Sequence, residues 1–424
     1  MADKIVSVTA QQIIDCKCRP AVEVEIRTES GAVGRGAAPT GTSVGMHEAF
    51  VLRDGDCSSY RGLSVHKAVD AVAKVIAPAI IGLDVNDQRT IDQVMINLDG
   101  TADKHVLGGN AIYSTSIAAF RAAADAKRIP LYNHIAGGAI GTVPVPCFNV
   151  VNGGKYSDFT QSFNEFLIVP YKTASIDHAV EMAVDVFLAL NDVLTEYLGH
   201  KPAVASSYGY AAPSDDPEVV LRLMRQAIER TPHRGAIAFA LDCASSEFHD
   251  KATGTYLLKG QRVTAAELID YTRQLTEQFD FVFIEDLLDE NDWDGYQRAK
   301  RELVRTLILG DDLTVTNLGF LQKAYDLQAV DGFILKPNQV GTISEALDAY
   351  RFAAQHGMIA VPSGRSGGVV DDVVMDLSVG LQVPFQKNGA PRSGERIEKL
   401  NFLMRASARS EGCRLYDIQP LLRF

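Results

Sequence analysis

The feature that most constrains the fold is an alternation of short apolar runs with helical patterns, which begins near residue 143. The apolar runs lack polar alternation and are bounded by Gly, Pro or charged residues, as strands buried on both faces are. A stretch with helical periodicity follows most of the runs, so the pattern predicts parallel strands joined by helical crossovers. The predicted strands lie at 147–151, 166–170, 235–241, 280–284, 305–309, 331–335 and 357–361, and the helices at 175–197, 217–231, 263–278, 293–303, 316–327, 342–355 and 369–380.

This many units favours closure into a barrel, and an open doubly wound sheet is the alternative. No Gly-x-Gly-x-x-Gly motif opens the first unit, which counts against a dinucleotide-binding fold. Residues 4–36 differ, because apolar and charged residues alternate there and predict an antiparallel meander. A Gly-, Thr- and Ser-rich loop follows at 38–45, and helical patterns occupy 66–80, 88–96 and 110–127. We therefore expect two domains in the 424 residues, a small α+β domain over 1–136 and a barrel over 137–424.

The later predicted strands end in ionisable or hydroxyl side chains. In α/β barrels the C-terminal ends of the strands form the rim that carries the chemistry. For any one strand, a helix cap or a solvated loop lysine explains such a residue equally well. Caps require only Asp or Ser, so the set as a whole favours a functional site. The strand ends are marked by Asp242, Glu285-Asp286, Asp311-Asp312, Lys336 and Ser363-Gly-Arg365-Ser366.

Three of these carboxylates, Asp242, Glu285 and Asp311, follow neighbouring strands and are the ligands we expect for a metal. A site built of carboxylate oxygens without His or Cys suits Mg²⁺ and leaves coordination positions open for a substrate. Lys336 follows the next strand, where a metal and burial would both favour its neutral amine and a role as general base. The sequence therefore predicts a magnesium ion beside a lysine base.

Further polar groups complete the predicted rim. Arg365 and Ser366 offer a planar fork and a hydroxyl to a phosphate, and Lys387 adds a second cation from the last unit. A Mg²⁺ ion beside a lysine base serves to remove a proton next to a carboxylate, since the metal stabilises the enediolate that forms. No Ser-His-Asp or Cys-His arrangement competes, because none of the nine histidines falls beside a strand-end nucleophile.

Charge and cysteine usage exclude other classes of function. The net charge of −12 and the lack of a basic run argue against nucleic acid or an anionic membrane as partner. No apolar stretch approaches the roughly 20 residues that span a bilayer. The six cysteines are scattered, and no signal-peptide pattern opens the sequence, so we expect a reducing cytoplasm. The pair Cys16 and Cys18 is too closely spaced for a zinc knuckle.

The series of motifs resembles that of the enolase family over nearly the whole chain. The resemblance implies the enolase fold, an N-terminal α+β capping domain on a modified (β/α)₈ TIM barrel, assembled as a homodimer or homo-octamer. It also implies a small phosphorylated or phosphonylated carboxylic acid as substrate and two Mg²⁺ ions per site. The matching stretches are Val51-Leu-Arg-Asp-Gly-Asp56, Leu98-Asp-Gly-Thr101, Phe148-Asn-Val-Val-Asn-Gly-Gly154, Ile284-Glu-Asp286, Gly310-Asp-Asp-Leu-Thr-Val-Thr-Asn317, Leu335-Lys336, Arg365-Ser-Gly367 and Lys387-Asn-Gly-Ala-Pro391.

The resemblance assigns roles to single residues. The family's metal ligands fall on Asp242, Glu285 and Asp311, its base on Lys336, its second lysine on Lys387 and its phosphate binders on Arg365 and Ser366. One of the two acid-side glutamates falls on Glu165. The mobile loop of the family, whose serine binds a second Mg²⁺, falls on Thr40 to Gly45 with Ser43, which we count among the metal ligands and the substrate-binding residues.

The chain departs from the family on the acid side. Enolases carry Gly-Asp-Glu-Gly-Gly-Phe-Ala-Pro, whereas this chain has Ser206-Ser-Tyr-Gly-Tyr-Ala-Ala-Pro213, which puts Tyr208 in place of the other acid-side glutamate. Two pocket histidines are replaced by Tyr156 and Gly364. We expect Tyr208 to belong to the catalytic group and Tyr156 and Gly364 to contact the substrate. The opening Ser-Arg-Gly-Asn-Pro signature reads Cys16-Lys-Cys-Arg-Pro20 here.

These losses are selective, because the groups for metal, carboxylate and phosphate remain together with the base. Loss of a general acid typically costs about 10² to 10⁴ in rate. The preferred interpretation is a diverged, Mg²⁺-dependent enolase that uses the enolate for another reaction, as carboxyphosphonoenolpyruvate synthase of phosphinate antibiotic pathways does. The alternatives are phosphopyruvate hydratase activity with a rearranged acid, and a non-catalytic enolase-like binding protein.

Overall fold

The computed structural model describes residues 2–41, 45–156 and 158–424. The chain begins with an antiparallel sheet of β1 (Ile5–Ile14), β2 (Pro20–Thr28) and β3 (Val33–Ala37) in that order, which confirms the predicted meander. Helices α1 to α5 follow in this part of the chain, with a π-helical turn, Val72–Ile76, between α1 and α2. They are α1 (His66–Ala71), α2 (Ala77–Ile80), α3 (Gln88–Asp99), α4 (Gly109–Ala126) and α5 (Leu131–Ala136).

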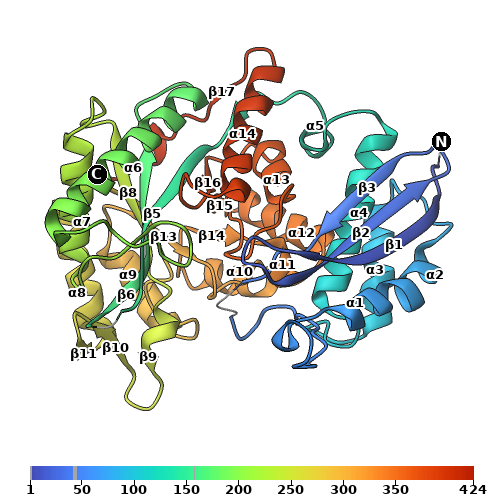
Figure 1. Cartoon of the computed structure of the whole chain (residues 1–424), viewed down its shortest axis with the longest axis horizontal. Coiled ribbons are helices and arrows are strands. Elements are labelled where there is room, and N and C mark those ends of the chain that lie inside the picture. The colour runs from blue at the N-terminus through green and yellow to red at the C-terminus, as the bar shows by residue number, and fades with distance from the viewer. Residues whose placement is uncertain (1, 42–44, 157) are drawn as a thin grey trace.

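Helix α4 packs closely against the sheet because small residues face each other across the contact. A side chain on Gly34 or Gly36 of β3 would collide with the backbone of α4 at Ala118 and Ser114. The helix is rich in Ala on this side, and almost all of it is buried. The N-terminal sheet therefore rests on one long, buried helix, at the opposite end of the molecule from the C-terminus (Figure 1).

The barrel follows from residue 145 and is closed within the part of the chain that the structure describes. Neighbouring strands run in the order β15, β14, β13, β12, β8, β6, β5, β16, and a parallel bridge between Ser363 and Lys387 links the two ends. The predicted barrel is therefore confirmed. Its strands are β5 (Val145–Lys155), β6 (Thr160–Pro170), β8 (Ile237–Asp242), β12 (Phe281–Glu285), β13 (Leu307–Gly310), β14 (Gly332–Leu335), β15 (Ile359–Pro362) and β16 (Phe385–Lys387).

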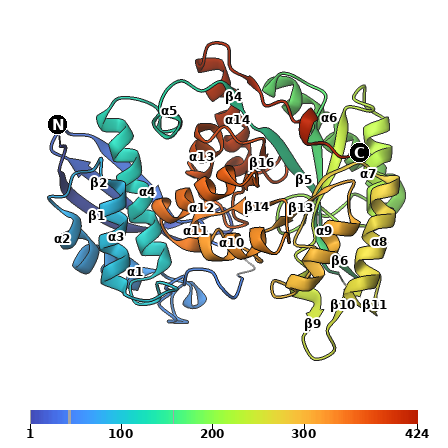
Figure 2. The same ribbon diagram turned by 180° about the vertical axis from the view of Figure 1, so that it is seen from behind.

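Helices cover the outside of this barrel (Figure 2). They are α6 (Ile176–Leu198), α7 (Pro217–Glu229), α8 (Ala265–Gln278), α9 (Trp293–Glu302), α10 (Leu318–Asp326), α11 (Pro337–Val340), α12 (Ile343–Gln355), α13 (Val374–Gly380) and α14 (Gly394–Arg409). Short elements complete the chain: β4 (Thr142–Val143), β7 (Tyr210–Ala211), β9 (His249–Asp250), β10 (Thr255–Leu258), β11 (Gln261–Val263), β17 (Arg414–Leu415) and the 3₁₀ turns Tyr60–Gly62, Ser245–Phe248 and Gln419–Leu421. No helix in the described ranges combines the length and apolar character needed to cross a bilayer.

The prediction of an all-parallel sheet is wrong for the first strands of the barrel. Strand β6 runs antiparallel to both of its neighbours, β5 and β8. A short connection of residues 156–159 joins β5 to β6, and parallel strands need a crossover of a dozen or more residues. The antiparallel direction has a functional consequence, because it puts the start of β6, with Glu165, at the same end of the barrel as the ends of the other strands.

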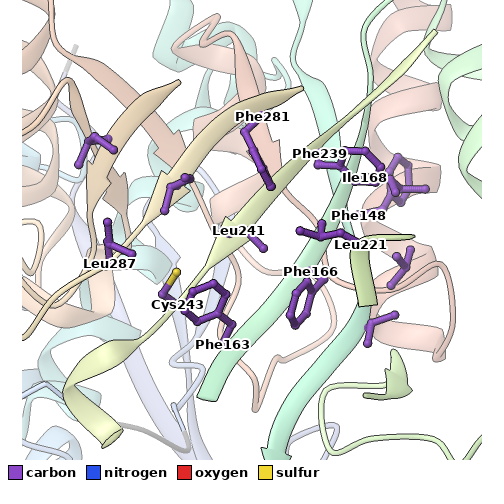
Figure 3. Packing of buried hydrophobic residues seen from close by; sticks show 14 of the residues in the cluster. Phe148, Phe163, Phe166, Ile168, Leu221, Phe239, Leu241, Cys243, Phe281 and Leu287 are labelled. Carbon is purple, nitrogen blue, oxygen red and sulfur yellow. The ribbon is translucent and has the colours of Figure 1, made fainter. Parts of the chain in front are cut away.

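Alternate residues of β8 belong to different hydrophobic clusters. Along β8, Ala238 and Ala240 belong to one cluster, while Phe239 and Leu241 pack with Leu221 of α7 in the other (Figure 3). Successive side chains of a strand point to opposite faces, so the first set faces the barrel interior and the second faces the helices.

The N-terminal part of the chain is held on the barrel by backbone and ionic contacts. The backbones of Thr40 and Gly367 exchange two hydrogen bonds of 3.1 and 2.9 Å. Arg89 of α3 forms an ion pair with Asp348 of α12, and the buried ammonium of Lys104 lies 3.1 Å from Glu345. These contacts place the segment around residue 40 beside the barrel rim.

Candidate active site

The candidate site residues share the strand face that points into the barrel. Asp242 follows Ala240 by two positions on β8, and Asp311, just past the end of β13, follows Leu309 by two positions. Both apolar residues belong to the interior cluster. The two-residue period of a strand therefore directs both carboxylates to the mouth of the barrel. The same two-residue spacing places Glu285 after Phe283, Lys336 after Ile334, Ser363 after Val361 and Lys387 after Phe385. In the antiparallel β6 the order is reversed, and Glu165 precedes Leu167 by two positions.

A cavity of about 310 Å³ opens at this end of the barrel. Polar and charged side chains dominate its lining, which draws on β5, β6 and β8 and on the loops that follow β12 to β16. Site residues predicted from the sequence line it: Glu165, Asp242, Asp311, Lys336, Gly364, Arg365, Ser366 and Lys387.

Lys387 holds three carboxylates together at the mouth. Its ammonium lies 2.6 Å from Oδ2 of Asp242, 2.7 Å from Oε2 of Glu285 and 3.1 Å from Oε2 of Glu165. Burial lowers the pKa of Lys387, but the three carboxylates outweigh it and hold that pKa well above its ordinary value. Strand register produces this group, since Asp242 is paired with both Glu165 and Glu285 in the sheet.

Lys336 and Asp311 form a second pair. The ammonium of Lys336 contacts Oδ2 of Asp311, and the amide of Gln339 donates to Oδ1 at 2.8 Å. The neutral amine expected at Lys336 beside a bound metal stays a prediction. Burial lowers the pKa of Lys336, but the neighbouring carboxylates, Asp311 first, together outweigh burial and raise it above its ordinary value. Burial alone would raise the pKa of Asp311, and the adjacent Lys336 lowers it. The proton thus rests on Lys336 while Asp311 carries its full negative charge.

The carboxylates of this site fit a hard cation. Glu285 is fully buried, and its Oε1 has no hydrogen-bond partner within the described ranges of the chain. Burial, and then the charge of Asp242, raise the pKa of Glu285 well above its usual value. A buried carboxylate oxygen without a partner is costly unless a cation compensates it. With Asp311, these residues offer oxygen donors without His or Cys, which is the donor chemistry of Mg²⁺.

Asp286 holds the turn that carries Asp311. Its Oδ1 accepts the N–H of Asp311 and its Oδ2 that of Asp312, both at 2.8 Å. Oxygens of these three carboxylates lie within 4.8 Å of one another. Burial, and then the charge of Asp311, raise the pKa of Asp286 to about 7 and that of Asp312 to about 9. Because backbone groups occupy both oxygens of Asp286, this residue positions Asp311 rather than offering a free ligand.

The predicted phosphate binder Arg365 already has an anionic partner. Its guanidinium donates to both carboxylate oxygens of Glu48, at 2.7 and 3.0 Å, and to Oδ1 of Asn338 at 3.2 Å. The carboxylate of Glu48 also accepts the N–H of Gly45 at 3.1 Å. The N-terminal segment thus contacts Arg365 through Glu48, and its Gly41 lines the cavity. Ser43, predicted here as a metal and substrate ligand, lies outside the described residues.

Two family models match the chain over nearly its whole length. The enolase C-terminal TIM barrel domain matches residues 141–414, and the enolase N-terminal domain matches residues 5–135. The chain belongs to the enolase family. The enolase fold expected from the motifs is thereby confirmed, and the protein is an enzyme of the enolase superfamily, whose members use Mg²⁺.

In this enolase-family protein, the two tyrosines that replace family residues do not line the cavity. The hydroxyl of Tyr156 donates to the carbonyl oxygen of Asn152 at 2.7 Å and accepts the N–H of Ala212 at 3.1 Å. The hydroxyl of Tyr208 donates to the carbonyl oxygen of Cys16. The structure therefore brings Glu165 to the carboxylates and lysines, and it does not bring Tyr156 or Tyr208 there.

Sequence reasoning missed several residues of the enolase-family site. Asn149 could have been found, because it follows the interior residue Cys147 by two positions on a predicted strand. Glu48 and Lys399 carry no such signal. They reach the site from a loop of the N-terminal part and from α14, so only the folded structure reveals them.

Proposed function

We propose that this protein is a Mg²⁺-dependent enzyme that forms an enolate from a 2-phosphoglycerate-like or phosphoenolpyruvate-like acid and then catalyses a reaction of the carboxyphosphonoenolpyruvate synthase type. The asymmetry of the cavity carries this proposal. On the side of the proposed base, Lys387 contacts Asp242 and Glu285, and Lys336 contacts Asp311. The other side of the cavity differs from that of enolases. Gly364 lines the cavity where enolases carry a histidine. Ser207 also lines it, whereas the next residue, Tyr208, which replaces the family's glutamate, does not.

Each group on the base side has a role in the proposal. Asp242, Glu285 and Asp311 would hold Mg²⁺, which stabilises the negative charge of an enolate when bound. Lys336 removes the proton at C2 when the acid is of the 2-phosphoglycerate type, once Asp311 no longer holds the charge on its ammonium. Phosphoenolpyruvate has no C2 proton, and its enolate oxygen is released by loss of the phosphoryl group. Lys387 keeps the substrate carboxylate oriented by its charge.

The second half of the reaction joins a carboxyphosphonyl group to the enolpyruvate oxygen. Written with phosphoenolpyruvate and carboxyphosphonate, the products are carboxyphosphonoenolpyruvate and inorganic phosphate. A new O–P bond forms between the enolpyruvate oxygen and the carboxyphosphonyl phosphorus. The O–P bond of phosphoenolpyruvate and one P–OH bond of carboxyphosphonate break, and the phosphoryl group leaves with that hydroxyl oxygen as inorganic phosphate. The exchange needs no oxidant or reductant. This reaction needs no acid to expel a C3 hydroxyl, which is consistent with the replacements at Tyr208 and Gly364.

The test follows the C2 proton of 2-phosphoglycerate in deuterated water with Mg²⁺, beside an assay for phosphoenolpyruvate and one for a carboxyphosphonate adduct. Exchange without rapid dehydration, together with the adduct, supports the proposal. Absence of both exchange and Mg²⁺ binding overturns it and favours a non-catalytic binding protein.

A second candidate, phosphopyruvate hydratase, is favoured by one contact. Glu165 lines the cavity and lies 3.1 Å from the ammonium of Lys387, so one carboxyl group of the family's acid side is still beside the base side. In this case the same assay would show phosphoenolpyruvate formed at a rate comparable to proton exchange. We further propose a homodimer or homo-octamer, as is typical of the family, which light scattering would distinguish.

A further inference from the structure

A buried cluster of charged residues lies on α14, beside the cavity and apart from the carboxylates that would bind metal. Arg396 lies 2.5 Å from Glu395, and the ammonium of Lys399 contacts Glu395 and lies 4.0 Å from Asp372. All four side chains are at least nine-tenths buried. The proton removal proposed above uses none of them.

Lys399 reaches the cavity because residue 364 is a glycine. A side chain built on Gly364 would collide with the ammonium of Lys399, so the lysine occupies the space next to that backbone. In the same way, a side chain on Gly389 would lie 2.8 Å from Nε of Arg396. The replacement of a family histidine by Gly364 is therefore matched by a cation that enters from another helix.

The cluster is oriented, with its cations on the cavity side. Arg396 and Lys399 line the main cavity, whereas Glu395 and Asp372 do not. These two carboxylates border a separate small cavity of about 20 Å³, which Lys399 also lines. The cationic side chains of the ion pairs thus border the main cavity, and the carboxylates lie behind them, away from it.

Two amide side chains with unused hydrogen-bonding groups line the same cavity. Asn388 is buried, and its Oδ1 lacks a partner in the described part of the chain. Asn149 is fully buried, and neither Nδ2 nor Oδ1 has a partner among the described residues. Buried polar atoms are normally paired, so these atoms indicate a ligand with both hydrogen-bond acceptors and donors. A protonated oxyacid with several oxygens meets this description.

We propose that Lys399 and Arg396 form a second anion subsite, completed by Asn388 and Asn149, that binds a second small oxyacid carrying a carboxylate or phosphonate group. This subsite rests on the proposed function, in which the second acid is the carboxyphosphonyl donor. The first acid has its own partners at Lys336, Lys387 and Ser366. A second anion in the same cavity needs further cations, and Arg396 and Lys399 supply them.

The test is calorimetric titration of carboxyphosphonate into the full chain with Mg²⁺ and saturating phosphoenolpyruvate. We compare wild type with the pair Lys399→Gln and Glu395→Gln, in which both partners of the ion pair become neutral, and with Gly364→Ala, whose methyl group displaces the ammonium of Lys399 and keeps its charge. Arg409→Gln, at the exposed end of α14, is the control. Melting temperatures establish that each variant is folded.

We expect carboxyphosphonate affinity to fall at least tenfold in the double variant and in Gly364→Ala, and by more than any change in phosphoenolpyruvate affinity. Arg409→Gln should bind as wild type does. The subsite is refuted if wild type binds neither carboxyphosphonate nor inorganic phosphate under these conditions, or if folded variants bind carboxyphosphonate as tightly as wild type. Proton exchange at C2 in wild type is measured separately, so a failure of the proposed function is distinguished from a failure of the subsite.

Discussion

The phenolic hydroxyl of Tyr208 donates a hydrogen bond to the backbone carbonyl oxygen of Cys16, 2.5 Å away. The guanidinium of Arg396 lies over the same ring, 4.8 Å from its centroid. Tyr208 adopts a φ of 73°, a left-handed conformation that costs a bulky residue about 1–3 kcal/mol. The two contacts offset this cost and join the N-terminal sheet, the loop before β7 and α14 at one point.

This geometry predicts that Tyr208→Phe weakens folding rather than chemistry. Loss of the hydrogen bond should lower the free energy of unfolding by about 1 kcal/mol. Urea unfolding measures the change, and Tyr197→Phe, at an exposed tyrosine of α6, should stay within about 0.5 kcal/mol of wild type. If Tyr208→Phe abolishes proton exchange at unchanged stability, Tyr208 is catalytic, as its position in the sequence predicts.

The positions of the strand-end residues could be predicted because they depend on local pattern. A buried run such as residues 305–309 fixes both the end of the strand and, through its two-residue period, the direction of Asp311. The direction of β6 cannot be predicted from its sequence, because an apolar run has the same pattern in a parallel and in an antiparallel strand. Glu165 was consequently assigned only by resemblance.

Pairs between distant segments lay beyond sequence reasoning for a different reason. Arg365 and Glu48 are 317 positions apart, and their ion pair depends on how the N-terminal part docks on the barrel. The contact between Lys336 and Asp311 is likewise not visible in the sequence, because the pattern indicates burial but not the ion pair. Pattern locates such groups on their strands but does not show their partners.

Asp286→Asn should disturb the turn that carries Asp311. The asparagine amide cannot accept the N–H that one oxygen of Asp286 accepts now, so a buried donor loses its partner at a cost of about 1–3 kcal/mol. We expect a lower free energy of unfolding and weaker Mg²⁺ binding by calorimetry. The exposed Asp326→Asn should change neither. Wild-type Mg²⁺ affinity in folded Asp286→Asn would show that the turn does not depend on this carboxylate.

The buried Asp92 predicts a pH-dependent stability. It accepts hydrogen bonds from Gln88 and from the backbone of Ser344, both at 3.0 Å, and burial raises its pKa from 3.8 to about 6. The folded protein holds this proton more tightly than the unfolded chain does, so stability falls as pH rises between these values and is level above them. A difference of roughly two pKa units corresponds to about 3 kcal/mol.

We therefore expect the stability of wild type, measured against that of Asp92→Asn, to fall by up to about 3 kcal/mol between about pH 4 and about pH 7. Urea unfolding at several pH values gives this difference. The exposed Asp70→Asn should show a difference that stays within about 0.5 kcal/mol across the same range. A difference that rises with pH for Asp92→Asn would contradict the raised pKa.

Binding of Mg²⁺ should stabilise the folded protein. At a concentration 100 times the dissociation constant, a ligand that binds only the folded state adds about 2.7 kcal/mol. We expect thermal denaturation to show this gain in wild type, and to show little of it in Asp242→Asn or Asp311→Asn, each compared with its own EDTA-treated sample. The exposed Asp294→Asn should retain the full gain. An undiminished gain in both ligand variants would place the metal elsewhere.

Replacement of the proposed base separates chemistry from metal binding. Lys336→Met keeps the length of the side chain and removes its amine, so exchange of the C2 proton of 2-phosphoglycerate should slow by about 10² to 10⁴. Asp311 then loses the ammonium that contacts it, and the demand of this buried carboxylate for a cation increases. The Mg²⁺-dependent gain in stability should therefore persist or grow while exchange is lost. The exposed Lys251→Met should exchange as wild type does. Rapid exchange in Lys336→Met would transfer the role of base to Lys387.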